Sequence, residues 1–414
     1  ASLFLVYSNQ NHSPFEMLDY FYARQEESGA IRGEYSIEDD KPVLTEENPE
    51  GFSPPLFAYV EYIFYHKVGN KKRLREVVPI LERYFAWLEE TSLQENGLYH
   101  VPTEACQTGN IPRIETFFPV DFNSQLALSA LYMSAIGDIL NDKEISFRYK
   151  RLYFSLKTRI NAHMWDEEDR FYYDLDKDGQ RIKSKLLVSY WAMLAEIPND
   201  ERANYLIAQL QDPKEFGTEN PFPAVPVSSP HYSEDGNGHC GGVFSVHTYM
   251  VVKALERYNH FVYARECAIR HMYFLLDTLH PDTDQIGDLW EAYLPNKEGP
   301  SKTDEIEGFP RRRLMHYAGL ATITLMIENI IGLDISLPRK TVDWMMPSLE
   351  VMGIENLSLK RNTITILSNK TDRGWEIRLE SEKLYYFTIE VLNEKKKKTL
   401  PIPSGKCSML IDKM

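Results

Sequence analysis

The sequence predicts a mainly α-helical protein that ends in a small antiparallel β domain, and three observations indicate this architecture. Apolar residues recur every three or four positions from Pro14 to about Gly332, as on one face of an α-helix. After Asp334 they alternate with polar residues, which is typical of strands. With 43% hydrophobic and 26% charged residues, the composition is that of a folded globular protein and not of a disordered chain.

Ten amphipathic helices are expected, each bounded by proline, glycine or polar residues. Antiparallel pairs of such helices bury many apolar faces together, so paired helices are the expected arrangement. The expected segments are 15–25, 54–68, 71–90, 120–140, 144–165, 184–196, 201–211, 243–258, 261–279 and 312–331.

Four segments after the helices alternate with period two, namely 356–369, 374–381, 383–393 and 407–413. The change in pattern falls near Pro338 to Pro347. We therefore predict a helical domain over 1–337 and a β-sandwich-like domain over 338–414, which either caps the helical part or binds sugar.

The charge pattern excludes some partners. The net charge of −15 repels phosphate backbones, and the basic run Lys395 to Lys398 has no interleaved aromatic residues, so nucleic-acid binding is not expected. No apolar run reaches the roughly 18 to 20 residues that span a bilayer, so no membrane partner is expected either. A neutral or cationic ligand fits the charge better. Nothing in the sequence indicates the oligomeric state.

The cysteines and the first residues leave the compartment open. The four cysteines, Cys106, Cys240, Cys267 and Cys407, are scattered, which indicates neither a zinc site nor a disulfide framework. The opening ASLFLVY has no basic flank and no cleavage signature, so it is not predicted to be a signal peptide as it stands.

No metal or cofactor is expected from the motifs. The run DLDKDG, Asp174 to Gly179, matches the first half of a calcium loop, but Lys185 occupies the position of the bidentate glutamate. A short hairpin turning at Asp178-Gly179 is the better interpretation. The eleven histidines lack ligand spacing, and no phosphate-binding glycine loop follows a strand.

Three long loops, 93–119, 216–242 and 279–311, separate the expected helices and can converge at one end of a helical barrel. Aromatic residues make up 12% of the chain, and sugar rings stack on aromatic side chains. Hydrolysis of a glycosidic bond needs an acid and a base, which two facing carboxyl groups supply. The candidate carboxylates in or beside the loops are Glu104, Glu115, Asp121, Glu219, Glu234, Asp235, Asp288 and Glu291.

Several stretches together resemble the (α/α)6-barrel glycoside hydrolases that include trehalase, processing α-glucosidase of family 63 and bacterial mannosylglycerate hydrolase. VDFNSQLALSALYMSAIG from Val120 resembles their V-D-L-N helix, and MWDEEDRFYYDLD from Met164 their W-D-x-x-x-x-F-Y-Y-D hairpin. GGVFSVHTYM from Gly241 is similar to their G-P-V-W helix, and HYAGLATITLMIENIIGL from His316 to their last barrel helix. The motifs follow the family's order, which implies an (α/α)6 toroid, possibly incomplete at its N-terminus.

The resemblance also implies site residues. LWEAYLPNKEG matches the family segment that carries the catalytic base, which places Glu291 at the base position. The family's acid is the aspartate of D-N-S-P-R, but the matching residue here is Gly109. The implied sugar contacts are Asn110, Arg113, Asp121, His239, Phe244, Trp290 and Tyr293. Phe244 replaces the family's tryptophan, and the arginine of its R-G-P-V-W motif is also absent.

Three functions stay open at this point. The first is an inverting glycoside hydrolase acting on an α-linked sugar, in which Glu291 is the base and Glu104 or Glu115 supplies the proton. The second is a glycan-binding pseudoenzyme of the same fold that has lost its acid. The third is another hydrolase or lyase acting on uronic-acid sugars, whose anionic substrates an acidic pocket disfavours. The expected partner is an oligosaccharide or glycoside.

Overall fold

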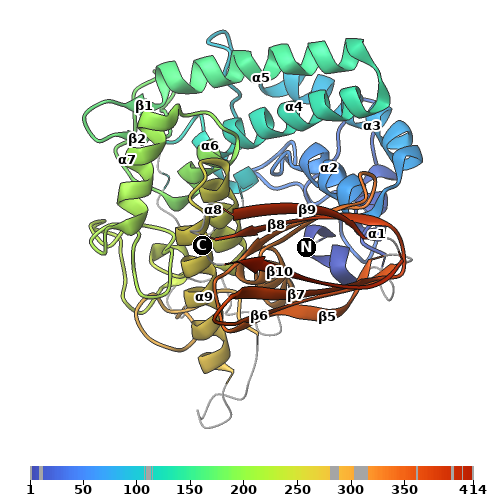
Figure 1. The fold of residues 1–414 in the computed structure, drawn as a ribbon. Coiled ribbons are helices and arrows are strands. Elements are labelled where there is room, and N and C mark those ends of the chain that lie inside the picture. The colour runs from blue at the N-terminus through green and yellow to red at the C-terminus, as the bar shows by residue number, and fades with distance from the viewer. Residues whose placement is uncertain are drawn as a thin grey trace.

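The computed structural model describes residues 2–8, 13–106, 108, 113, 115–279, 289–302, 316–359, 362–392, 396–402 and 404–412. Among the described residues before 332, the regular structure is helical except for one short hairpin, and two sheets follow (Figure 1). The α-helices are α1 (Glu16–Tyr22), α2 (Phe57–Val68), α3 (Lys71–Ser92), α4 (Val120–Leu140), α5 (Lys143–His163), α6 (Trp191–Leu194), α7 (Asp200–Gln211), α8 (Ser245–Arg257), α9 (Phe261–Thr278) and α10 (His316–Leu325).

Shorter helical turns complete this part of the chain. The 3-10 helices are η1 (Ser2–Ser8), η2 (Thr103–Cys106), η3 (Leu187–Tyr190) and η4 (Gly238–Cys240), and a π-helical segment, η5 (Met326–Ile331), continues α10. Helices lie at all ten predicted segments, with ends that agree within a few residues except in two. In the segment 184–196 a 3-10 turn precedes the short α6, and in 312–331 the residues before 316 lie outside the described residues.

The helices form an inner ring covered by outer helices. In the ring, α4 packs on α2 and α6, α8 packs on α6 and α10, and η1 contacts both α2 and α10. The ring is thus closed by a 3-10 helix. Helix α4 is buried on nearly all sides, whereas its outer partner α5 buries one face only. Gly137 permits their close approach, because a Cβ there would lie 2.6 Å from the backbone nitrogen of Ser146.

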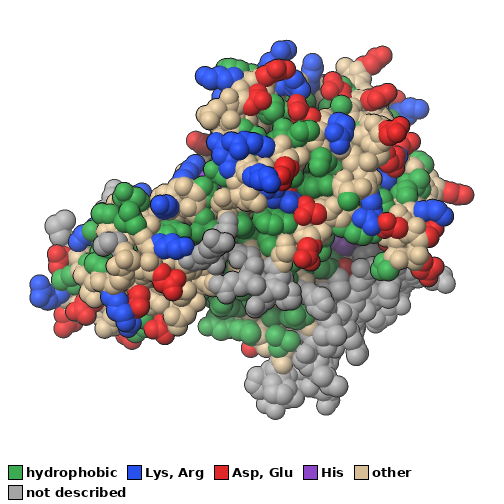
Figure 2. All heavy atoms as spheres, turned by 90° about the vertical axis from the view of Figure 1, so that its right-hand side faces the viewer, with side chains coloured by type: hydrophobic (Ala, Val, Ile, Leu, Met, Phe, Trp, Pro, Cys, Tyr) green, Lys and Arg blue, Asp and Glu red, His purple; other side chains and the backbone are tan. Residues whose placement is uncertain are grey.

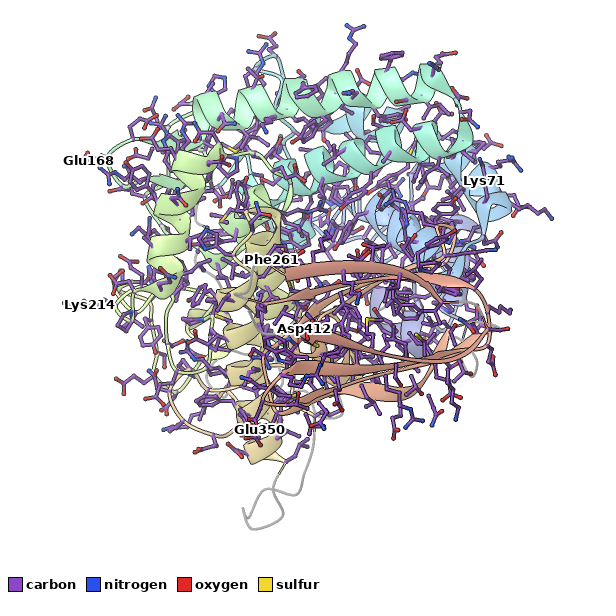
Figure 3. All side chains as sticks on the ribbon, viewed as in Figure 1. Lys71, Glu168, Lys214, Phe261, Glu350 and Asp412 are labelled. Atoms are coloured by element: carbon purple, nitrogen blue, oxygen red, sulfur yellow. The ribbon has the colours of Figure 1, made fainter. Side chains whose placement is uncertain are left out.

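The outer surface carries the charged ends of the amphipathic helices. Lys71 at the start of α3, Glu168 in the turn after β1 (Trp165–Asp166) and Lys214 after α7 lie at the periphery of the molecule (Figure 3). Strand β1 pairs with β2 (Phe171–Tyr172) in the hairpin that the family resemblance implies, and the turn predicted at Asp178-Gly179 follows it, where Leu175 bridges to Arg181. Within the described part of the chain, no helix is long and apolar enough to cross a membrane.

The C-terminal residues form two packed four-stranded sheets. One has the order β10-β7-β6-β5 and the other β3-β4-β8-β9. The strands are β3 (Leu333–Ser336), β4 (Thr341–Met346), β5 (Val351–Leu359), β6 (Asn362–Lys370), β7 (Gly374–Ser381), β8 (Tyr385–Val391), β9 (Lys396–Ile402) and β10 (Gly405–Asp412). Their shared core includes Trp344, Trp375 and Phe387. Figure 2 shows this pair of sheets projecting from the helical part, with charges of both signs mixed over that face.

The β domain differs from the expectation in two respects. Strands β4 and β8 pair in parallel, with Val342 beside Phe387, so the domain is not wholly antiparallel. Strands β3, β4 and β9 lie outside the segments chosen from the sequence. The lysine-rich β9 is an edge strand, where lysine discourages pairing with other chains. The boundary after residue 337 stays a prediction, and β3 precedes it.

One buried carboxylate joins both ends of the helical ring. Glu328 on η5 lies 2.9 Å from Nζ of Lys253 on α8 and 3.3 Å from Nζ of Lys67 on α2. It also accepts a hydrogen bond of 2.7 Å from the hydroxyl of Tyr7 on η1. Burial raises the pKa of Glu328, but the two lysines outweigh it, and the pKa falls to about 2. Its contribution to stability is therefore complete above about pH 4.5 and is lost as the pH falls toward 2.

Replacing Glu328 by glutamine is expected to lower the free energy of unfolding by about 3 kcal/mol at pH 7, because two buried ammonium groups lose their shared partner. Denaturant unfolding followed by circular dichroism measures this change. The matched control is Glu144→Gln, which removes an exposed ion pair with Arg148 and should cost about 0.5 kcal/mol or less. Equal effects of the two substitutions would contradict the role given to Glu328.

Candidate active site

The segment that carries Glu291 is fixed against the start of α8. The backbone of Tyr293 pairs with that of Val243, with N–O distances of 2.9 Å in both directions. Ser301 donates its amide to the carbonyl of Ala292 at 3.0 Å, which folds the segment back on itself. Position 242 requires glycine, since a Cβ there would lie 2.4 Å from the carbonyl oxygen of Gly238. Two of the three long loops therefore meet at Glu291.

The carboxylate of Glu291 lies near the start of α10. The hydroxyl of Tyr317, the second residue of that helix, donates a hydrogen bond of 3.1 Å to Oε1 of Glu291. The Glu291 side chain is partly exposed, whereas its neighbours Trp290 and Tyr293 are buried in a cluster with Leu275 of α9. The Tyr293 ring also packs edge-on against that of His271, with centroids 6.0 Å apart. The contact of Trp290 and Tyr293 with sugar stays a prediction.

A buried histidine connects the Glu291 segment to two other elements. Nδ1 of His271 on α9 lies 2.9 Å from Oδ1 of Asn220, and its Nε2 lies 2.9 Å from Oγ of Ser245 at the start of α8. Because the Asn220 oxygen can only accept, Nδ1 carries the proton and Nε2 accepts from the serine. The side-chain amide of Asn220 in turn donates to the carbonyl of Leu294, and its backbone amide donates to the carbonyl of Pro295. Sequence reasoning missed His271, which lies within a helix pattern and has no motif.

Arg113 is held by two buried aspartates. Its Nη2 lies 2.6 Å from Oδ1 of Asp121, and its Nε lies 2.9 Å from Oδ2 of Asp174. Nη1 contacts Asp121 again and the hydroxyl of Thr108. Asp174 also accepts the amide of Val120 at 2.8 Å, which fixes the start of α4. The Arg113 guanidinium thus holds the 108–121 loop in position. Asp174 is also the first residue of the DLDKDG run, which resembles the first half of a calcium loop.

His239 and Phe244 lie side by side in the loop before α8. Their rings are stacked with centroids 4.1 Å apart, and His247 lies 5.9 Å from His239. Burial lowers the pKa of His239, and the charges of His247 and Arg113 lower it further. The convergence of all three long loops on one site stays a prediction.

The remaining candidate carboxylates have differing surroundings. Glu104 on η2 is exposed and accepts a hydrogen bond from Thr103 at 3.3 Å. Glu115 is exposed, and its φ of +66° lies in the left-handed region that residues other than glycine rarely adopt. Asp235 pairs with Lys302 at 2.7 Å. Glu219 and Glu234 are exposed, while Gly109, Asn110 and Asp288 lie outside the described residues. Among the residues described, no group of three or more potential ligands could hold a metal ion.

The ring of paired helices, with a loop carboxylate at the N-terminal end of its inner helices, defines the class of (α/α)6 glycoside hydrolases. The family model of the mannosylglycerate hydrolase MGH1-like glycoside hydrolase domain matches residues 16–305, and that of the trehalase C-terminal domain matches residues 332–414. The chain belongs to the MGH1-like glycoside hydrolase family, so the predicted fold class and the predicted group are confirmed.

The chain is also similar to a bacterial relative in sequence and to solved structures in fold. An uncharacterized protein of Borreliella burgdorferi is 50% identical over 415 residues, which cover 100% of this chain and 87% of that protein. The GH63 mannosylglycerate hydrolase from Thermus thermophilus has a similar fold, with a TM-score of 0.61 at 18% identity over 79% of this chain and 91% of that one. An α-L-rhamnosidase from Dictyoglumus thermophilum covers 100% of this chain with 45% of its own length, with a TM-score of 0.63 at 12% identity.

Replacing His271 by leucine is expected to lower the free energy of unfolding by about 3 kcal/mol at pH 7, because Asn220 and Ser245 lose buried partners. Burial lowers the pKa of His271 to about 4, so the folded protein keeps it neutral while the unfolded chain protonates it near pH 6.5. Stability due to His271 therefore falls as the pH drops from 6.5 to 4. Denaturant unfolding should show the two proteins converging by about 1.4 kcal/mol per pH unit.

The matched control for this experiment is His231→Leu, which changes an exposed histidine. It should leave both the stability and its pH dependence within about 0.5 kcal/mol of the parent. A parallel pH dependence in the parent and in His271→Leu would contradict the assignment of a neutral, hydrogen-bonded His271.

Proposed function

We propose that the protein hydrolyses an α-linked glycosidic bond with inversion, and that Glu291 is the general base that activates the attacking water. The observation that carries this proposal is the placement of Glu291. Its segment is fixed by backbone pairing to Val243, its carboxylate accepts a hydrogen bond from Tyr317, and it matches the base position of the family. A general base must be held in position with a free oxygen for water, and Oε2 of Glu291 is the candidate.

The acid is proposed to come from the 104–115 loop, as Glu104 or Glu115. An acid is required because an alkoxide leaves poorly without protonation, and general-acid assistance is typically worth about 10² to 10⁴ in rate. Both side chains are exposed, on the loop that Arg113 fixes by its ion pairs with Asp121 and Asp174. The left-handed backbone at Glu115 favours this residue, because such strain is often retained where it positions a functional group.

The substrate is proposed to be an oligosaccharide or small glycoside. The proposed contacts to the sugar are Asn110, His239, Phe244, Trp290 and Tyr293. Arg113 and Asp121 hold the loop in position through their mutual ion pair, because the N–H donors of Arg113 point at the carboxylates of Asp121 and Asp174. The relative from Thermus thermophilus is named a mannosylglycerate hydrolase, which makes a short α-mannoside a reasonable first substrate to assay.

Replacing Glu291 by glutamine should lower kcat on a hydrolysed glycoside by about 10² to 10⁴, because the water loses its base. The assay is product formation followed by proton NMR, which also reports whether the first-formed sugar has the inverted anomeric configuration. The control is Glu298→Gln on the same segment, an exposed residue that should keep its activity. Retention of configuration would contradict the mechanism, and binding without turnover in the parent protein would favour the pseudoenzyme.

Glutamine at Glu104 and at Glu115 should have different effects, because only one of them is proposed to protonate the leaving group. For that residue, kcat on a natural glycoside falls by about 10² or more, while kcat on an aryl glycoside with an acidic phenol leaving group is nearly unchanged. A comparison of the two substrates in each variant measures this difference. Equal, substrate-independent effects at both positions would exclude the 104–115 loop as the source of the proton.

A further inference from the structure

A cavity lies at the other end of the inner helices from Glu291. Its volume is about 530 Å³, within the range of roughly 300 to 1,000 Å³ typical of small-molecule sites. Helix α8 begins at Ser245, beside the His271 network, and its residues Lys253 and Glu256 line the cavity. Glu256 lies eleven positions after Ser245, a rise of about 16 Å along the helix, so the cavity and the Glu291 segment are separate.

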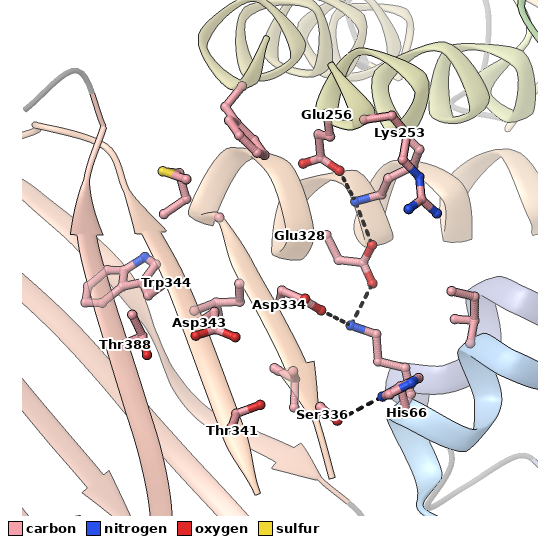
Figure 4. Close-up of a pocket in the computed structure, with 18 of the residues that line it drawn as sticks. His66, Lys253, Glu256, Glu328, Asp334, Ser336, Thr341, Asp343, Trp344 and Thr388 are labelled. Atoms are coloured by element: carbon pink, nitrogen blue, oxygen red, sulfur yellow. Dashed lines mark hydrogen bonds and ion pairs between the residues drawn. The ribbon is translucent and has the colours of Figure 1, made fainter. Parts of the chain in front are cut away.

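The cavity lies between the helical ring and one face of a sheet. Thr341 and Asp343 of β4 and Thr388 of β8 border it from the sheet, opposite Lys253 and Glu256 (Figure 4). These strand residues alternate with buried ones that face the sandwich core, such as Val342. Phe261, which also borders the cavity, marks the start of α9 in Figure 3. A polar sheet face thus covers the C-terminal ends of the inner helices.

The charges on the cavity wall are mostly paired. Lys67 contacts Glu328 and Asp334, and Lys253 contacts Glu328 and Glu256 (Figure 4). At the mouth, Arg339 and Asp343 are both exposed and form no ion pair with any residue that the structure describes. Positive and negative groups therefore balance, and the wall favours a neutral ligand over an anion or a cation.

Aromatic rings and hydroxyl groups supply the other contacts. The rings of Tyr59, Tyr62 and Tyr132 pack together, with centroids 4.5 and 5.2 Å apart, and border the cavity. Within the described ranges, the hydroxyls of Tyr59, Tyr62 and Tyr249 have no hydrogen-bond partner in the protein. Most of the surface of Tyr59 and Tyr249 is buried, since the two residues are only 5% and 6% exposed. None of these three hydroxyl oxygens is among the buried atoms without a partner, so they reach open space at the cavity, where a ligand with hydroxyl groups of its own can form hydrogen bonds with them.

We propose that this cavity binds a neutral mono- or disaccharide that is not hydrolysed there. Sugar hydroxyls can form hydrogen bonds with the tyrosine hydroxyls and donate hydrogen bonds to the carboxylates of Glu256 and Asp343. The C–H face of a sugar can pack against an aromatic ring. The saccharide touches both the helical ring and the sheet, so its binding stabilises the contact between them. The proposal does not depend on Glu291.

The test uses isothermal titration of the full chain, in the parent and in Glu291→Gln, with glucose, mannose, maltose, sucrose and glucose 6-phosphate. Three variants locate the site. Asp343→Trp fills the mouth, and the pair Tyr59→Phe with Tyr249→Phe removes two hydroxyls but keeps the rings. Glu376→Trp is the matched control, because it places the same bulky ring at an exposed acidic strand position that does not border the cavity.

One neutral saccharide is expected to bind to the parent and to Glu291→Gln alike. Its binding is lost in Asp343→Trp, weakened about tenfold in the tyrosine pair and unchanged in Glu376→Trp, since each hydrogen bond contributes about 0.5 to 1.5 kcal/mol. Binding that survives both cavity variants overturns the proposal, as does no binding at about 10 mM of any neutral saccharide. If glucose 6-phosphate binds ten times more tightly than every neutral saccharide, the inferred preference for a neutral ligand is overturned. The tyrosine pair keeps the test valid if Asp343→Trp fails to fold.

Discussion

The helical ring depends on the ion pairs of Glu328 with Lys67 and Lys253. These contacts join elements that lie far apart in the chain, because Tyr7 belongs to the first helical turn, Lys67 to α2 and Glu328 to the last turn before the sheets. A buried carboxylate is costly unless cations compensate it, and here two lysines and a hydroxyl do so. Asp334 of β3 extends the network through Lys67, so the sheets begin where the ring closes.

Closure of the ring also determines where the Glu291 carboxylate lies. Tyr317 belongs to the same helical run as Glu328, at its other end, and Ser245 belongs to the same helix as Lys253. A shift of α8 or α10 at the closing network would therefore move the partners of Glu291 and His271. The loops themselves have little regular structure, so their positions rely on such anchors and on the ion pairs of Arg113.

Much of the fold could be predicted from the sequence, because long amphipathic helices such as α4 and α5 carry a clear period. Strand β9 was missed because its lysines resemble a solvated charge run, and β3 and β4 because they are short and half covered by the helical part. At the site, the prediction of Glu291 as the base rests only on the ordered motifs around it. His271 and Asp174 could not be assigned, since their roles arise from partners far away in sequence. Arg113 was predicted to hold sugar, but which groups it faces depends on tertiary structure.

The two ends of the inner helices carry opposite chemistry for a physical reason. Helix N-termini favour negative groups and C-termini favour positive ones. Glu291 lies beside the first turn of α10 and near the start of α8, whereas Lys67 lies in the last turn of α2 and Arg257 in that of α8. Carboxylate chemistry is thus suited to one end of the ring. At the other end, the cations require the compensating acids that make the cavity beneath the sheet polar but balanced in charge.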